Sequence, residues 1–120
     1  MADRIMFIGW GNPVRGREER GLEVFNEAIG LYGRMQQDGR IESFDVALLD
    51  PSGGIEGYAA LRGSAKQIAA LREDEEFRRL MVDSALIVDN LQVLNGVCEK
   101  GLEREIATYQ SAVAKVPQTA

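Results

Sequence analysis

Two segments of this 120-residue chain carry apolar side chains at odd and even positions alike. The first is Ile5 to Gly9, followed by the turn-forming segment Gly9-Trp10-Gly11-Asn12-Pro13, and the second is Leu86 to Val97. A strand that alternates polar and apolar residues can face water on one side, whereas a strand that is apolar at every position must be buried on both. These two strands therefore require a layered fold in which both faces of a sheet are covered.

Between the two apolar strands, the sequence predicts a long helix and a hairpin. Apolar residues recur at helical spacing from Arg17, and Gly39 is the expected C-terminal stop. The next segment, Ile41 to Leu49, alternates as a strand does, and the turn Pro51-Ser52-Gly53-Gly54 joins it to a further strand, Ile55 to Arg62. The long helix carries its apolar stripe at Leu22, Phe25, Ala28, Ile29, Tyr32 and Met35.

Three further helices complete the pattern. Ser64-Ala65-Lys66-Gln67 fits a capping box that begins one short helix, and Asp74 can cap a second. A terminal helix is expected at about Gly101 to Val116, ended by Pro117. Its apolar stripe consists of Leu102, Ile106, Tyr109 and Val113.

The order strand, helix, strand, strand, helix, strand, with an added terminal helix, is typical of the ferredoxin-like β-α-β-β-α-β arrangement. We therefore expect one α+β domain over residues 1–120, with an antiparallel four-stranded sheet, a core at 4–98 and a C-terminal helix at about 101–116. The helices between the strands can cover only one face of such a sheet. The other face must meet the terminal helix, a ligand or another subunit, and a homodimer packed sheet to sheet is the simplest expectation.

Charge and cysteine content exclude several classes of protein. The net charge is -5 and the pI is about 4.8, so the average field repels phosphate backbones, and nucleic acid is not an expected partner. The single cysteine, Cys98, cannot form an intramolecular disulfide, and the N-terminus lacks the pattern of a signal peptide. No apolar run is long enough to span a membrane. These features predict a cytoplasmic protein.

Two short motifs imitate binding signatures without completing them. Gly11-Asn12-Pro13-Val14-Arg15-Gly16 has the glycine spacing of a phosphate-binding loop, but Glu18 stands where a hydroxyl must hold magnesium. The segment Glu56 to Leu61 partly imitates an RNA-recognition motif and lacks its basic residue and second aromatic. The chain has no histidine, which excludes His-based triads and imidazole metal sites. We therefore expect no metal and no cofactor, and Cys98 is interpreted as a small core residue.

A few polar residues remain as candidates for a site at the second sheet face. Asp45 is the most informative, because it lies between Phe44 and Val46 in the middle of a strand, where a carboxylate is disfavoured unless it is exposed, paired or functional. An exposed or arginine-paired aspartate and an acid-base group are both compatible with this position, and Asp89 has the same ambiguity. The candidate catalytic residues are thus Asp45 and Asp89, and the candidate ligand-binding residues are Trp10, Asn12, Arg15, Tyr58, Arg62 and Asn90.

The element order, together with Gly16-Arg17-Glu18, Gly39-Arg40-Ile41-Glu42-Ser43-Phe44, Gly53-Gly54 and Arg62-Gly63, resembles uncharacterised bacterial members of the dimeric α/β-barrel superfamily over about Arg4 to Cys98. The resemblance implies a ferredoxin-like protomer, dimerisation through sheet faces, and a cavity between sheet and helices. Members use that cavity for cofactor-free oxygenation, haem chemistry, isomerisation or simple binding. The YCII-related branch works with a histidine-aspartate pair, and this histidine-free chain cannot share that chemistry.

Three functions follow as hypotheses. The first is a homodimer that binds a small organic molecule in a cavity at the sheet face. The second is a cofactor-independent enzyme in which Asp45 or Asp89 is the general base and Tyr58, Arg15 or Asn90 steadies an oxyanion. A buried Asp45 would favour the enzyme, and an Asp45 paired on an open surface would count against it. The third is an interaction module that docks through the stripe of the terminal helix.

Overall fold

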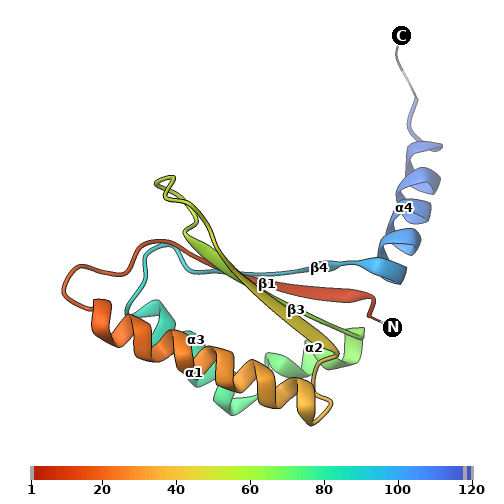
Figure 1. Ribbon diagram of the computed structural model, residues 1–120. Coiled ribbons are helices and arrows are strands. Elements are labelled where there is room, and N and C mark those ends of the chain that lie inside the picture. The colour runs from red at the N-terminus through yellow and green to blue at the C-terminus, as the bar shows by residue number, and fades with distance from the viewer. Residues whose placement is uncertain (1, 118, 120) are drawn as a thin grey trace.

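The computed structural model describes residues 2–117 and 119, and it places four strands and four helices in an α+β arrangement (Figure 1). Helices α1, α2 and α3 lie together on one side of the sheet, and α4 extends from its edge. In chain order the elements are β1 (Arg4–Trp10), α1 (Glu18–Gln37), β2 (Ser43–Leu48), β3 (Gly57–Gly63), α2 (Ala65–Leu71), α3 (Glu75–Ala85), β4 (Gln92–Val97) and α4 (Glu99–Val113).

The sheet has the strand order β2-β3-β1-β4, and every neighbouring pair is antiparallel. The ferredoxin-like prediction is therefore confirmed, with an open rather than a closed sheet. Met6 pairs with Leu61, and Ile8 pairs with Val93. Because side chains alternate along a strand, this register places Met6, Ile8 and Trp10 on the face toward the helices and Ile5 and Phe7 on the other.

The helices form where the sequence supplies both an apolar stripe and a stop or a cap. In α1, Glu18 and Glu19 complement the positive end of the helix dipole, and Gly39 follows with a φ of 81°, which only glycine adopts without strain. In α2, the Ser64 side chain accepts from the Gln67 N–H while the Gln67 side chain accepts from the Ser64 N–H. The predicted capping box is thus present.

The core lies between the sheet and α1, α2 and α3. Its largest fully buried side chains come from two strands, two helices and the segment before β2. They are Met6, Met35, Ile41, Leu61 and Leu71. Tyr32 packs edge-on against Phe44 with ring centroids 5.8 Å apart, which joins α1 to the edge strand β2.

The fourth strand is shorter than the sequence predicted, because only Gln92–Val97 of the expected Leu86 to Val97 is strand. The preceding residues turn back along the loop after β1, where Val14 N–H donates to Ile87 O (2.7 Å) and Asp89 N–H donates to Asn12 O (2.9 Å). Asn90, with a φ of 60°, then redirects the chain into β4. Ile87, Val88 and Leu91 therefore pack against one end of the core instead of extending the sheet.

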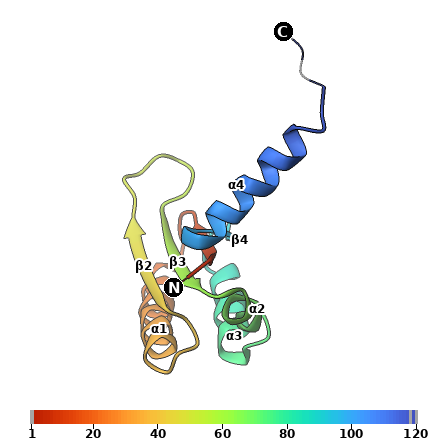
Figure 2. The same ribbon diagram turned by 90° about the vertical axis from the view of Figure 1, so that its right-hand side faces the viewer.

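One face of the sheet and nearly all of α4 remain exposed within the described residues. Figure 2 shows α4 leading away from the sheet at the edge formed by β4. The helix spans Glu99–Val113, two residues earlier at its start than expected, and Gly101 is its only buried residue. The described helices include none that is both long and apolar enough to cross a membrane.

Candidate functional site

A cavity of about 550 Å³ lies on the helix side of the sheet, between α1, the ends of β1 and β2, and the segment 81–91. Its walls are mostly aliphatic and aromatic side chains. The lining residues from the first half of the chain are Ile8, Trp10, Gly11, Pro13, Glu18, Gly21, Leu22, Val24, Phe25, Ala28, Ile29, Tyr32, Val46, Leu48 and Leu49. Those from the second half are Glu56, Ala59, Met81, Ser84, Ile87, Val88 and Leu91.

Small residues in the walls leave this space open. Gly21 and Ala28 lie on α1, and Ala59 lies on β3 opposite Ile8. Larger aliphatic residues at these positions would fill the layer between helix and sheet, as they do in a packed core. The small size of these three wall residues is therefore consistent with an open space between α1 and the sheet.

Trp10, the single tryptophan of the chain, forms one wall of the cavity. Its ring meets Phe25 edge-on, with centroids 6.1 Å apart and an interplanar angle of 73°. It also covers Gly57, where an added Cβ would lie 2.7 Å from Cζ2 of the indole. The glycine lets the ring lie flat against β3, so the indole is held in place from two sides.

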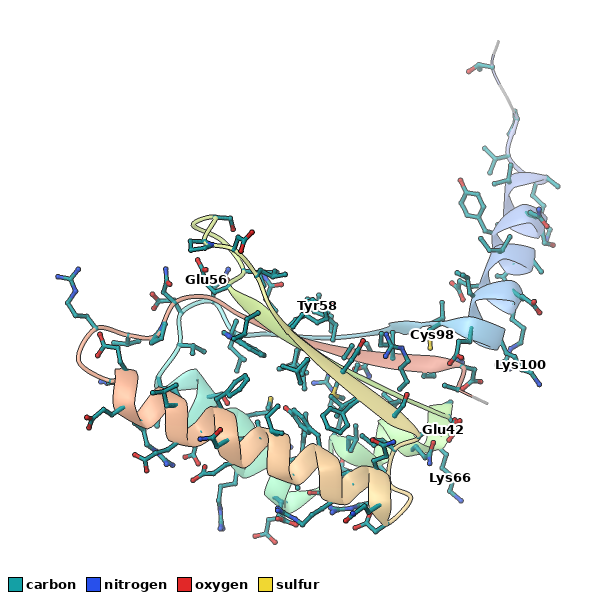
Figure 3. The ribbon with its side chains drawn as sticks, viewed as in Figure 1. Glu42, Glu56, Tyr58, Lys66, Cys98 and Lys100 are labelled. Carbon is teal, nitrogen blue, oxygen red and sulfur yellow. The ribbon has the colours of Figure 1, made fainter. Side chains whose placement is uncertain are left out.

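The mouth of the cavity combines exposed leucines with acidic side chains. Leu22 and Leu48 are 68% and 70% exposed, an unusual state for two large apolar residues at one opening. Glu18 and Glu56 also line the cavity, and among the described lining residues there is no lysine or arginine. Figure 3 shows Glu56 at the end of the sheet where the β2–β3 loop rises. The opening is therefore apolar with negative charge.

Tyr32 contributes a phenol to the cavity wall. Burial raises the pKa of this phenol above its usual value of 10, so the hydroxyl stays neutral at physiological pH. A neutral phenol can donate or accept a hydrogen bond. Together with Ser84, it supplies uncharged polar contacts in a mainly apolar space.

The glycine loop between β1 and α1 uses its own polar groups internally. Gly11 N–H donates to Asp89 O (2.7 Å), and a Cβ at Gly11 would lie 2.9 Å from that oxygen. Gly16 N–H donates to the Glu18 carboxylate (2.9 Å). Because a glutamate of the chain occupies the amide that a phosphate-binding loop would offer, the interpretation of these glycines as turn residues agrees with the geometry.

The opposite face of the sheet carries Tyr58, which Figure 3 shows on the side away from the helices. Its ring stacks on Phe7 with centroids 5.4 Å apart. On the same face, Arg62 donates to the Asp45 carboxylate (2.9 Å), and Asp45 is 57% exposed. An aspartate paired on an open surface does not provide the buried base that the enzyme hypothesis requires.

The predicted site residues do not gather at one place. Trp10 lies in the cavity, whereas Asp45, Tyr58 and Arg62 lie on the opposite face of the sheet. The remaining candidates lie in exposed segments at the end of the sheet: Asn12, Arg15, Asp89 and Asn90. Sequence reasoning assigned Phe25, Ala28 and Tyr32 to the core stripe of α1, and only the small size of Ala28 and Gly21 could have suggested a cavity there.

Cys98 lies at the N-cap of α4 and is partly buried. Burial, followed by the charge of Glu99, raises the pKa of its thiol above the usual value of 9.0. A thiol in this state is a poor nucleophile at neutral pH. Within residues 2–117 and 119, acidic and cysteine side chains form no cluster arranged to hold a metal ion.

Comparison with known proteins gives a fold and no family. No family model matches the chain, and no curated protein matches it. Among solved structures, it is similar to a dimeric protein of unknown function and ferredoxin-like fold from Bacteroides fragilis. The two share 11% identity with a TM-score of 0.59, and the match covers 79% of this chain and 96% of the other. At this identity the likeness supports the fold alone.

Proposed function

We propose that this protein binds a small, mainly apolar organic molecule in the cavity between α1 and the sheet. The observation that carries the proposal is the cavity itself, whose 550 Å³ falls within the range of small-molecule sites. Such sites combine apolar walls with a few polar groups that orient the ligand. Here Trp10 and Phe25 offer aromatic surfaces, and Tyr32 and Ser84 offer uncharged polar groups.

The charge at the mouth restricts the class of ligand. Glu18 and Glu56 repel a carboxylate or phosphate, and no basic side chain among the described lining residues offsets them. A neutral or cationic molecule is therefore favoured over an anion. Its apolar part would lie beside Trp10 and Ala28, and an amine or hydroxyl could remain near the glutamates at the opening.

We further propose that the protein is a homodimer. The structurally similar Bacteroides fragilis protein is described as dimeric, and the face of the sheet away from the helices has no covering layer among the described residues. That face carries Ile5, Phe7, Tyr58 and Leu94. Leu94 is 55% exposed and the other three are half-buried, and apolar side chains on an uncovered sheet face are typical of subunit interfaces.

Titration with N-phenyl-1-naphthylamine tests the binding proposal, because this uncharged aromatic probe fluoresces in apolar surroundings. We expect saturable emission with a dissociation constant in the micromolar range, accompanied by a change in Trp10 emission. Ala28→Phe fills the cavity and should weaken binding by about tenfold or more. Ala70→Phe, on the exposed side of α2, is the matched control and should bind as the parent protein does. Equal binding by both variants would refute the site.

A further inference from the structure

We propose that α4 is an exchanged arm, which packs its apolar stripe onto the open sheet face of a second copy of this chain. The part of the stripe concerned is Leu102, Ile106 and Tyr109, and the open sheet face is the side of the sheet turned away from α1, α2 and α3. This inference rests on the homodimer proposed above and is independent of the ligand. It assigns a partner to two apolar surfaces that one protomer leaves uncovered.

The direction of α4 is fixed by contacts between its first two turns and Asp3, the residue before β1. Gly101 packs so closely on the backbone before β1 that an added Cβ would overlap the carbonyl oxygen of Asp3. Cys98 N–H donates to the same carbonyl (3.2 Å), and Arg104 donates to the Asp3 carboxylate. Three contacts to one residue hold the first turns of the helix. The arm therefore leaves the domain in a defined direction and does not fold back over its own sheet.

Beyond these contacts, the apolar side chains of α4 are largely exposed and pack little against the rest of their own chain. Leu102, Ile106 and Tyr109 are 51%, 50% and 68% exposed. The radius of gyration is 17.0 Å, against about 14 Å for a compact domain of this length. Figure 1 shows why, since α4 rises from the end of β4 on the side of the sheet opposite the other helices. A helix with an apolar stripe gains its stability mainly from packing, so this arm requires a partner surface.

The open sheet face offers a matching surface. Phe7 lies over Gly9, where an added Cβ would approach its ring to 2.8 Å, and Ile5 lies against Gly96. Because glycine has no side chain, nothing projects from the sheet at these two positions, and Phe7 and Ile5 lie over them. Leu94, on the edge strand β4, is 55% exposed. A helix stripe packs on the apolar part of such a face, and the Asp45–Arg62 pair lies beside it on β2 and β3.

The areas show why the arm is needed. Four strands about 4.8 Å apart and about 20 Å long cover roughly 400 Å² in projection. A stable interface buries about 800 Å² on each partner, so the sheet face alone provides about half of that amount. The 15 residues of α4 add a strip about 22 Å long and 10 Å wide, or roughly 220 Å² in projection. Each protomer then contributes its own arm and the strip of sheet beneath the partner's arm, roughly 440 Å² in projection, which exceeds the sheet face alone and corresponds to a larger accessible area.

A second copy is the occupant that fits both surfaces at once. Each chain carries one arm and one open sheet face, so a two-fold axis lets both be used twice in a closed pair. The alternative, in which the arm enters the α1 cavity of the other copy, would leave the open sheet face of each chain uncovered. The residues that α4 contacts in the dimer therefore distinguish the proposed arrangement.

Sedimentation velocity on the full chain tests the exchange with two matched variants. Ile106→Glu places a charge in the stripe, and Ala107→Glu places the same charge on the other side of α4, where it is equally open to water. We expect the parent and Ala107→Glu to be dimers. We expect Ile106→Glu to raise the dimer dissociation constant by about 100-fold, because the charge would be buried without a partner. Far-UV circular dichroism at the same concentrations verifies that each variant is folded.

The outcomes separate the inference from the proposal on which it rests. If Ile106→Glu remains as dimeric as the parent while Leu94→Glu becomes monomeric, the sheet face forms the dimer and the arm inference is wrong. A monomeric parent or an open polymer overturns the exchange and the proposed homodimer together. The probe titration of the cavity is unaffected by any of these results, so the binding proposal is judged separately.

Cross-linking shows which chain the arm contacts. The Tyr109→p-benzoylphenylalanine variant is prepared as a mixture of unlabelled (light) and isotope-labelled (heavy) chains. On irradiation, its benzophenone group reacts with neighbouring carbon–hydrogen bonds. We expect cross-links between light and heavy chains, ending on the open sheet face near Phe7 or Leu94. Products that join α4 only to its own chain would overturn the proposal.

Discussion

Arg104, in the second turn of α4, donates a hydrogen bond to the carboxylate of Asp3, which immediately precedes β1 and lies 101 positions earlier in the chain. The contact joins the two ends of the folded domain. It also determines where the apolar stripe of α4 is presented. Substitutions at the α4–Asp3 contacts, at the helix caps and on the two sides of the sheet should therefore have distinct effects.

Substitution of Arg104 should alter the titration of Asp3. The hydrogen bond from Arg104 is the largest cause that lowers the pKa of Asp3 below its ordinary value of 3.8, and the nearby Arg4 acts in the same direction. A lowered pKa means that the contact stabilises the fold fully above pH 3.8 and that this contribution is lost as the pH falls through the folded-state pKa. Carboxyl carbon NMR should show the Asp3 midpoint rising toward 3.8 in Arg104→Gln. The distant Arg78→Gln should leave it unchanged.

Two glycine-to-alanine substitutions should have opposite effects. Gly101→Ala introduces an overlap with the Asp3 backbone, so it should displace α4 and lower the thermal unfolding midpoint. Gly33→Ala, in α1, meets nothing within 4 Å and should stabilise the fold by about 0.5–1 kcal/mol, because alanine is the better helix former. Calorimetry measures both changes. A neutral Gly101→Ala would show that the root of α4 is not tightly packed.

Removal of the α2 cap should destabilise the domain. Ser64→Ala deletes the oxygen that accepts from Gln67 N–H (3.1 Å), and it should cost about 1 kcal/mol in the free energy of unfolding by urea. Ser111→Ala, on the exposed surface of α4, is the control and should change that free energy by less than about 0.5 kcal/mol. An equal effect of the two substitutions would contradict the capping box.

Loss of the Asp45 charge should have little effect on stability or binding. The Asp45–Arg62 pair is exposed, and exposed pairs contribute about 0–1 kcal/mol. Asp45→Asn should therefore fold normally and should bind N-phenyl-1-naphthylamine as the parent does, because the residue lies on the other side of the sheet from the cavity. Weaker probe binding in this variant would indicate a site at the open sheet face instead.

The sequence predicted best those structural features that depend only on residues close together in the chain. The capping box at Ser64, the Asp74 cap, whose side chain accepts from Phe77 N–H (2.9 Å), and the stop at Gly39 all depend on neighbouring residues, and all are present. The strand alternation also placed Met6 and Phe7 on opposite faces, because the period of a strand is two.

Long-range arrangement was less predictable. The apolar run 86–91 has the composition of a strand, yet it pairs with residues 11–14 after β1, a contact that no local pattern contains. The cavity was missed for a related reason. An apolar stripe on α1 looks the same whether it meets large or small residues, and only the fold brings Gly21, Ala28 and Ala59 to the walls of one cavity.

The most direct test of the cavity as the binding site is NMR of protein labelled at the isoleucine δ1 methyl groups, in complex with N-phenyl-1-naphthylamine. Three isoleucines line the cavity, Ile8, Ile29 and Ile87, whereas Ile5 lies on the open sheet face and Ile106 on α4. We expect nuclear Overhauser contacts from the probe to the three cavity methyl groups. Contacts to Ile5 or Ile106, with none to the cavity methyl groups, would contradict it.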